Sequence, residues 1–230
     1  MTGRRRAGIA RVGRGVVATR IIASMTAQPR QVGVVLFDGF ELLDVIGPIT
    51  LLDRLPDHFA VTLLGPLAGP VRSSQGAELV ATGGYRDAAT PDIVMVPGGL
   101  GACALAQDDD FLSWLRTWAG AAPLVTSVCT GSALLAAAGL LAGYRATSNK
   151  RSFGWAAGFG TEVEWVARAR WVHDRDRWTS SGVAAGMDMT AALIAELVGA
   201  ETAEHAAQLI ELDLHTDPDW DPFAAANGLV

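Results

Sequence analysis

The stretch PLVTSVCTGSALLAAAGLL, residues 123–141, decides the fold because its character changes at Cys129. The residues before Cys129 are apolar and β-branched, which is typical of a buried strand, and those after it are rich in Ala and Leu, which is typical of a helix. A side chain at such a strand-to-helix turn points out above the sheet. Because the amino terminus of a helix favours a thiolate, we expect Cys129 to be a nucleophile. The alternative is a buried structural cysteine.

The rest of the chain repeats this alternation of strand and helix. Three more apolar runs are predicted to be buried strands, at residues 32–37, 60–65 and 91–99. Helical patterns lie at residues 41–55, where a loop comes first, and at 108–120, 185–199 and 201–215; residues 77–85 are predicted to be extended and residues 163–182 to form two or three short strands. Such alternation predicts a mostly parallel sheet with helices on both faces. We expect one α/β domain over residues 31–220 and a C-terminal tail, residues 221–230.

The carboxyl ends of these strands bring a few residues to one edge of the sheet. Asp44 follows the first strand, Gly98 and Gly99 follow the third, and Cys129 and Thr130 follow the fourth. In parallel α/β sheets the active site lies beyond this edge. Near a thiolate the pKa of Asp44 should rise, which would make this carboxyl a general acid. The alternative is that Asp44 only caps the next helix, but the VIGP sequence that follows is expected to delay the start of that helix.

Composition and charge exclude several classes of protein. The 230 residues carry a net charge of −6, and because residues 1–31 hold seven arginines and no acid, the rest carries −13. An acidic body disfavours nucleic-acid binding, and no apolar stretch reaches the about 20 residues of a membrane span. Residues 1–30 are expected to be a basic, disordered extension or the result of an early start codon, with Met25 a later one. Two cysteines are too few for a disulfide scaffold or a zinc site, so a cytoplasmic protein without a metal is expected.

Other residues are weaker candidates for a function. Cys103 is expected to be a small packing residue, and none of the four histidines lies in a motif that supplies a partner. The GGLGA segment, residues 98–102, lacks the first position and the βαβ placement of a dinucleotide fingerprint, so a nicotinamide cofactor is not expected. Residues 180–182 are expected to form a turn that borders the site. Trp155 and Trp165 are either cavity walls or core residues.

Four segments, in this order and at these separations, resemble the DJ-1/PfpI superfamily and, within it, the isonitrile hydratase branch. They are FDGFELLDVIGP (37–48), PDIVMVPGG (91–99), VCTGSALLAAAGLLAGYRAT (128–147) and WTSSGVAAGMDMTAALI (178–194). The resemblance covers residues 32–214 and implies a flavodoxin-like three-layer sandwich, a homodimer and no cofactor. It also implies that Cys129, Thr130 and Asp44 are the catalytic residues.

The sequence departs from the family pattern in two places. Peptidase-like relatives have a histidine directly after the cysteine, where this chain has Thr130, so a protease reaction is not expected. Many relatives have ATTHW after the elbow helix, whereas this chain has ATSNKRSFGW, which includes Asn149 and the only lysine, Lys150. The missing histidine disfavours glyoxalase-type chemistry and leaves the substrate of this subgroup open.

The leading hypothesis is a cofactor-independent lyase that hydrates an isonitrile to an N-substituted formamide. The Cys129 thiolate would attack the isonitrile carbon while Asp44 protonates it, and water would then hydrolyse the thioimidate. Thr130 would orient water or Asp44, Gly98 and Gly99 would bind substrate, and the amides of Gly99 and Thr130 would stabilise the developing charge.

Two alternatives come from other functional classes. One is a stress protein whose cysteine senses oxidant by forming sulfenic acid. The other is the ligand-binding half of a transcription regulator. The sequence weakens this second alternative, because no helix-turn-helix pattern follows the domain and the basic start lacks helical periodicity.

Overall fold

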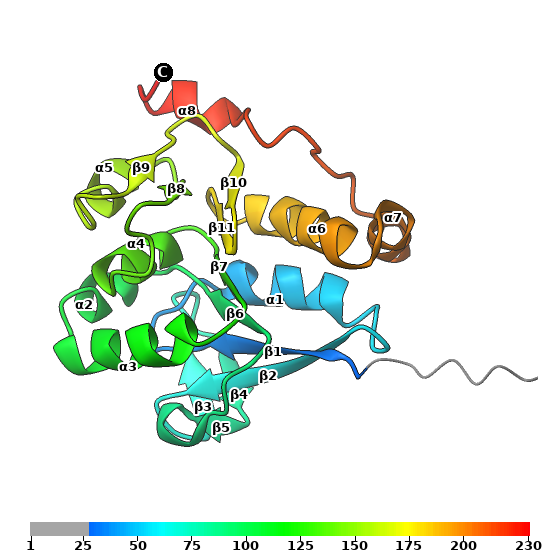
Figure 1. Ribbon diagram of the computed structural model, residues 1–230, viewed down its shortest axis with the longest axis horizontal. Helices are drawn as coiled ribbons and strands as arrows, with labels where there is room; N and C mark the ends of the chain where they lie inside the picture. Colours follow the sequence, from blue (N-terminus) through cyan, green and yellow to red (C-terminus); the bar gives the residue numbers. More distant parts are fainter. Residues whose placement is uncertain (1–27) are drawn as a thin grey trace, which may run out of the picture.

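A seven-stranded sheet forms the middle layer of the fold (Figure 1). The computed structural model describes residues 28–230, so the expectation of a disordered extension over residues 1–30 falls almost wholly outside the described residues. In spatial order the strands are β10 (Trp171–Asp174), β11 (Arg177–Ser180), β7 (Leu124–Ser127), β6 (Ile93–Val96), β1 (Arg30–Val35), β2 (Phe59–Gly65) and β5 (Gly83–Gly84). Strand β10 runs antiparallel to β11, and the other neighbours pair in parallel, as the sequence predicts.

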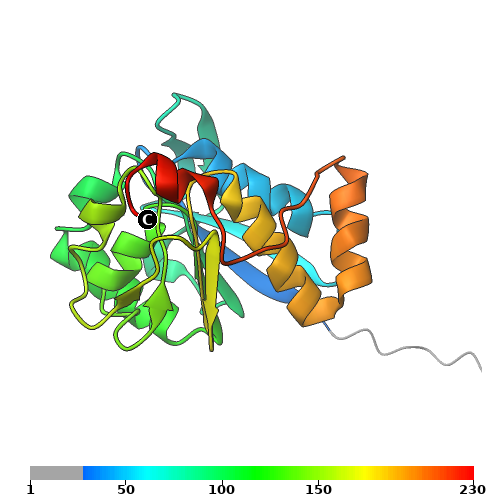
Figure 2. The same ribbon diagram turned by 90° about the horizontal axis from the view of Figure 1, so that it is seen from above.

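Helices cover both faces of the sheet. On one face, α4 (Gly131–Ala137) contacts α2 (Ala102–Leu105) and α3 (Asp109–Gly120); on the other, α1 (Leu42–Leu52), α6 (Ala185–Val198) and α7 (Ala200–Leu209) contact one another. The view from above shows the two groups on opposite sides of the strands (Figure 2). This is the three-layer α/β sandwich that the sequence predicts. None of the helices described in residues 28–230 combines the length and apolar character needed to cross a membrane.

Several small elements complete the fold around the central sheet. They are the hairpin of β3 (Gly69–Arg72) and β4 (Glu78–Ala81), the 3₁₀ turn η1 (Tyr85–Asp87), the parallel pair β8 (Arg145–Ala146) and β9 (Glu164–Trp165), and the short helices α5 (Phe153–Ala156) and α8 (Pro222–Ala226). Strands β4 and β5 make most of residues 77–85 extended, as expected, although Tyr85 belongs to η1; β3, the hairpin partner of β4, was not anticipated. Helix α8 contains part of the predicted C-terminal tail and lies at the same end of the molecule as α5 (Figure 1).

The core is built around the strands that lead to the site. All four residues of β6 are buried, and so are Val125 of β7 and Leu134 and Leu135 of α4. Full burial of such a side chain contributes about 1.5–3 kcal/mol. The strand-to-helix turn at Cys129 therefore joins two elements that packing holds firmly in place.

Three helix boundaries differ from the sequence expectation. Helix α1 begins at Leu42, so VIGP does not delay it, and Pro48 lies inside the helix. A proline inside a helix is normally unfavourable because it lacks the N–H that would donate to the preceding turn. Here the buried residues of α1, Leu51 and Leu52 among them, keep the helix packed on the core. Helix α4 ends at Ala137, just before Gly139 with its φ of +77°. Helix α7 ends at Leu209 instead of reaching residue 215.

Candidate active site

Cys129 occupies a strained and tightly held turn between β7 and α4. Its φ of +59° is unusual for a residue other than glycine, as expected for a residue at such a turn. The Cys129 N–H donates to the Ser181 carbonyl at 3.1 Å, and the Cys129 carbonyl accepts from the hydroxyls of Ser132 and Ser148, both at 3.1 Å. The side chain is almost buried, with 6% of the residue exposed. These hydrogen bonds thus hold the backbone of the turn that carries the thiol.

Asp44 lies in the first turn of α1 and points toward the ends of β6 and β7. Its carboxylate Oδ2 accepts the Gly98 N–H at 2.8 Å, and the residue is fully buried. Among the described residues, Asp44 Oδ1 has no well-aligned hydrogen-bond donor. Glu41 occupies the N-cap position of α1, so the alternative reading of Asp44 as a helix cap is wrong.

Burial controls the ionisation of Asp44. It raises the pKa of this carboxyl from 3.8 to about 7; the Gly98 amide opposes the rise, Glu41 adds to it, and the Cys129 thiol lowers it slightly. The expected rise is therefore confirmed, but its main cause is loss of water rather than repulsion by a thiolate. At neutral pH Asp44 is poised to accept a proton or to release one.

The Cys129 thiol is protonated in the resting site, contrary to the expectation of a thiolate. Burial, and then the charge of Asp44, raise its pKa to about 12. Three donors act in the opposite direction: the backbone amides of Thr130 and Val183 and the side chain of Asn149. The short helix α4 cannot outweigh burial next to a carboxylate. The donors around the sulfur would stabilise a thiolate once its proton leaves.

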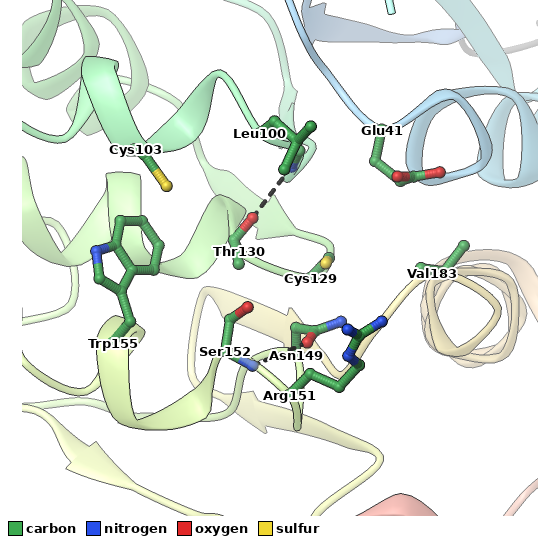
Figure 3. Close-up of a pocket in the computed structure, with 11 residues that line it drawn as sticks. Glu41, Leu100, Cys103, Cys129, Thr130, Asn149, Arg151, Ser152, Trp155 and Val183 are labelled. Carbon is green, nitrogen blue, oxygen red and sulfur yellow. Dashed lines mark hydrogen bonds between the residues drawn. The ribbon is translucent and has the colours of Figure 1, made fainter. Parts of the chain in front are cut away.

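Asn149 is a residue whose role the sequence did not reveal. Its Oδ1 accepts the Ser152 N–H at 3.1 Å, which directs the other end of the amide toward Cys129 (Figure 3). The close approach depends on Gly182, because a Cβ there would lie 2.4 Å from Asn149 Nδ2. The only sequence signal was that Asn149 falls where many relatives have the segment with histidine. The turn at residues 180–182 thus borders the site through its backbone, as predicted.

The thiol opens into a cavity of about 430 Å³. Its lining residues are Glu41, Gly99, Leu100, Cys103, Cys129, Thr130, Asn149, Arg151, Ser152, Trp155 and Val183 (Figure 3). Cys103 was expected to be a packing residue, but it is exposed and faces this cavity, because α2 lies at its rim. Trp155 forms a wall, whereas Trp165 packs edge-on against Phe153, with ring centroids 6.0 Å apart.

The glycine loop holds the site together, and its amides are already engaged. Gly98 is buried outside the cavity lining and donates to Asp44, and the Gly99 N–H donates to Thr130 Oγ1 at 3.1 Å. The Thr130 amide faces the Cys129 sulfur. The Gly99 amide is therefore not free to stabilise developing charge, because it already donates to Thr130 Oγ1, whereas the Thr130 amide is placed to stabilise charge that develops on the sulfur. The Thr130 hydroxyl keeps its own proton to donate into the cavity.

Histidine has no place in this site. None of the four histidines lines the cavity; His173, for example, is exposed and stacks on Trp178 with ring centroids 3.9 Å apart. Across residues 28–230, no three side chains of the metal-binding types gather closely enough to hold an ion.

Comparisons with known proteins agree with this architecture. The sequence pattern of the DJ-1/PfpI family matches residues 30–196. The chain belongs to the DJ-1/PfpI family. Within this family, an isonitrile hydratase of Pseudomonas putida is 40% identical over 190 residues, which cover 82% of this chain and 79% of the hydratase. The crystal structure of a THiJ/PfpI family protein from Pseudomonas syringae has a TM-score of 0.75 and 31% identity, and the match covers 90% of this chain and 83% of that chain.

Part of a transcription regulator is also similar to this chain. The HTH-type transcriptional regulator GbdR of Pseudomonas aeruginosa is 29% identical over 178 residues, which cover 75% of this chain but 48% of the regulator.

The family match includes Asp44 and Cys129 and ends within α6. Helices α7 and α8 therefore lie beyond the part of the chain that the DJ-1/PfpI pattern describes.

Proposed function

We propose that this protein hydrates isonitriles to N-substituted formamides, with Cys129 as nucleophile and Asp44 as the group that moves protons. The observation that carries the proposal is the buried pair itself, a thiol next to a carboxyl with a pKa of about 7, at the edge of a cavity of about 430 Å³. A general acid and base works best when its pKa lies near the working pH. The 40% identity to an isonitrile hydratase supports this choice of reaction.

The first step forms a covalent bond to sulfur. The Asp44 carboxylate takes the proton of the Cys129 thiol and delivers it to the terminal carbon of the isonitrile, while the sulfur bonds to that same carbon. The carbon–nitrogen triple bond becomes a double bond, which gives a neutral thioimidate and regenerates the carboxylate. The resting state found here, with the proton on sulfur, therefore suits the reaction, because the thiol supplies the proton that the carbon needs.

Water then releases the product. The Asp44 carboxylate takes a proton from water as the oxygen attacks the thioimidate carbon, and passes that proton to nitrogen. Asp44 next takes the remaining hydroxyl proton as the carbon–sulfur bond breaks, and returns it to the departing sulfur. The Thr130 hydroxyl, whose oxygen accepts from the Gly99 amide, donates to and orients the attacking water.

The donors around the sulfur act where charge develops. After Asp44 takes the thiol proton, and again as the carbon–sulfur bond breaks, the sulfur carries negative charge, and the N–H groups of Thr130 and Val183 and the side chain of Asn149 stabilise it. An asparagine can donate a hydrogen bond without giving up its proton at neutral pH. Asn149 thus stabilises the sulfur without competing with Asp44 for the proton.

The same geometry disfavours the oxidant-sensor alternative. Redox-sensing cysteines have a low pKa and are accessible to solvent, whereas the Cys129 thiol is buried and its pKa is raised. The likeness to a transcription regulator covers only 48% of that regulator, so it supports this alternative less than the hydratase match supports the proposed reaction.

The test is a panel of isonitriles incubated with the protein. We expect products heavier than the substrates by one water, identified as formamides by mass spectrometry, and no such product from Cys129→Ala. A panel in which no isonitrile gains water would overturn the proposed reaction. Reversible oxidation of Cys129 at low peroxide, measured on the same preparation, would then favour the sensor.

A further inference from the structure

A second cavity lies beside the reactive one and shares part of its wall. It measures about 390 Å³, and Asn149, Arg151 and Val183 line both cavities. The other lining residues of this second cavity are Lys150, Ser181, Gly182, Ala184, Phe223 and Asn227. A molecule that reacts at Cys129 could therefore extend past Asn149 into a space that the proposed mechanism does not use.

The second cavity is cationic although the protein is acidic. Its lining contains Lys150 and Arg151 and no acidic residue, whereas the chain as a whole carries a net charge of −6. Arg151 is exposed, and within residues 28–230 it makes no ion pair. Its guanidinium, which can bind a carboxylate through two parallel hydrogen bonds, is therefore available at the junction of the two cavities.

Lys150 adds buried positive charge to the same wall. It is 4% exposed, and its ammonium donates to two neutral oxygens, Thr147 Oγ1 at 2.7 Å and the Ala169 carbonyl at 2.6 Å. Burial lowers its pKa to about 8, against an opposing effect of Asp221. The charge of Lys150 is thus only partly compensated, and a nearby anion would stabilise it.

The outer wall of this cavity comes from the end of the chain. Phe223 belongs to α8, is 60% exposed and lies beyond the residues that match the family. Helix α8 is nevertheless fixed to the body, because the Asp221 N–H donates to the Arg168 carbonyl at 2.9 Å and the Asp221 side chain caps the helix through the Phe223 N–H at 2.9 Å. An exposed aromatic ring next to two cations suits a ligand with an apolar spacer and an anionic end.

We propose that the second cavity binds a carboxylate at the far end of the substrate, with Arg151 as its main partner. The substrate class is then an isonitrile whose reactive carbon lies at Cys129 and whose spacer passes Asn149 and packs against Phe223. This identification of the substrate rests on the proposed isonitrile reaction. The anion site itself rests on the lining of the second cavity.

The first experiment compares an aryl isonitrile with its para-carboxylate. We expect the wild-type protein to favour the carboxylate in kcat/KM, and Arg151→Gln to reduce the ratio of the two values by about tenfold or more, as for the loss of one charge-assisted hydrogen bond. Arg54→Gln removes another exposed arginine, just after α1, and should leave the ratio unchanged. A ratio that is the same in wild type and Arg151→Gln would overturn the proposal.

A second experiment needs no isonitrile. In a Cys103→Ser background, the rate at which iodoacetanilide alkylates Cys129 is compared with the rate for its para-carboxylate. We expect the para-carboxylate to alkylate Cys129 of the wild-type protein faster than iodoacetanilide does. This preference should be lost in Arg151→Gln and should weaken as salt is raised. Equal preferences in the two proteins would contradict the anion site. A preference that depends on Arg151, in a protein that hydrates no isonitrile, would instead uphold the site and reject the reaction.

Discussion

The floor and the outer wall of the two cavities are built in different ways. The floor, with Cys129 and Asp44, is buried and lies within the family match; the Gly98 N–H donates to Asp44, and the Ser181 carbonyl accepts from the Cys129 N–H. The wall presents exposed side chains such as Arg151 and Phe223, and α8 lies outside the family match. Because of this difference, the buried floor determines the reaction, whereas side chains of the exposed wall can change the preference for a substrate without changing the reaction.

The largest effect should come from removing the sulfur. Cys129→Ala should reduce isonitrile hydration to the background rate, because it removes the thiol that forms the covalent adduct. Cys103→Ala, which removes the other thiol lining the cavity, is the matched control and should retain hydration. Formamide production measured by mass spectrometry distinguishes the two. Equal rates for both variants would mean that the floor does not carry the chemistry.

A smaller effect should follow from displacing a donor of the floor. In Gly182→Ala the new Cβ would lie 2.4 Å from Asn149 Nδ2, so Asn149 must move away from the sulfur. We expect about a tenfold or greater loss in kcat/KM, the effect of losing one hydrogen bond to a charged group. Gly154→Ala, in α5, where a Cβ meets nothing within 4 Å, is the control. Unchanged kinetics in Gly182→Ala would show that Asn149 plays no part in the reaction.

The pH dependence should report the floor rather than the wall. The proposed first step needs the Asp44 carboxylate, whose pKa is raised to about 7. With a neutral isonitrile, kcat/KM should rise with pH and level off above about 7, falling about tenfold per pH unit well below that value. Arg151→Gln should leave the midpoint unchanged. A profile that is flat between pH 5 and about 9 would contradict the role of Asp44 as base.

The last of these effects concerns stability rather than rate. Because the pKa of Asp44 is higher in the folded protein than the ordinary 3.8, protonation stabilises the fold at low pH, and this contribution is lost as the pH rises through about 7. Asp44→Asn does not lose this contribution. The free energy of unfolding of this variant relative to wild type should therefore increase between pH 4 and about 8, by up to about 4 kcal/mol, and its melting temperature relative to wild type should rise with it. Asp53→Asn, on the surface after α1, is the control. A difference in melting temperature that does not change with pH would show that Asp44 is not buried as described.

The sequence predicts those features that depend on local pattern. The apolar strands, the turn at Cys129 and the meeting of Asp44 with the glycine loop all follow from runs of residues and from the rule for parallel sheets. The protonated state of the thiol could not be predicted, because it depends on burial by residues distant in sequence. The roles of Asn149 and Val183 were missed for the same reason: three separate segments must fold before they surround one sulfur atom.

The loop amides show a second limit of the sequence. No sequence pattern around Gly98 or Gly99 indicates that the N–H groups of these two residues donate hydrogen bonds to Asp44 and Thr130. The same holds for Pro48, because its place inside α1 reflects tertiary packing that overrides local propensity. Backbone hydrogen bonds and packing between distant segments therefore decide the details that local sequence leaves open.

The most direct test of the central claim is a pair of rates measured on Asp44→Asn: hydration of an isonitrile and alkylation of Cys129 by iodoacetamide, in a Cys103→Ser background. The amide cannot carry protons, so hydration should fall by about 10²-fold or more. Removing the charge of Asp44 lowers the pKa of the Cys129 thiol, so alkylation should be retained or become faster. Hydration at a rate near that of wild type would contradict the proposed mechanism, and the loss of both rates would mean that Asp44 only maintains the structure of the site.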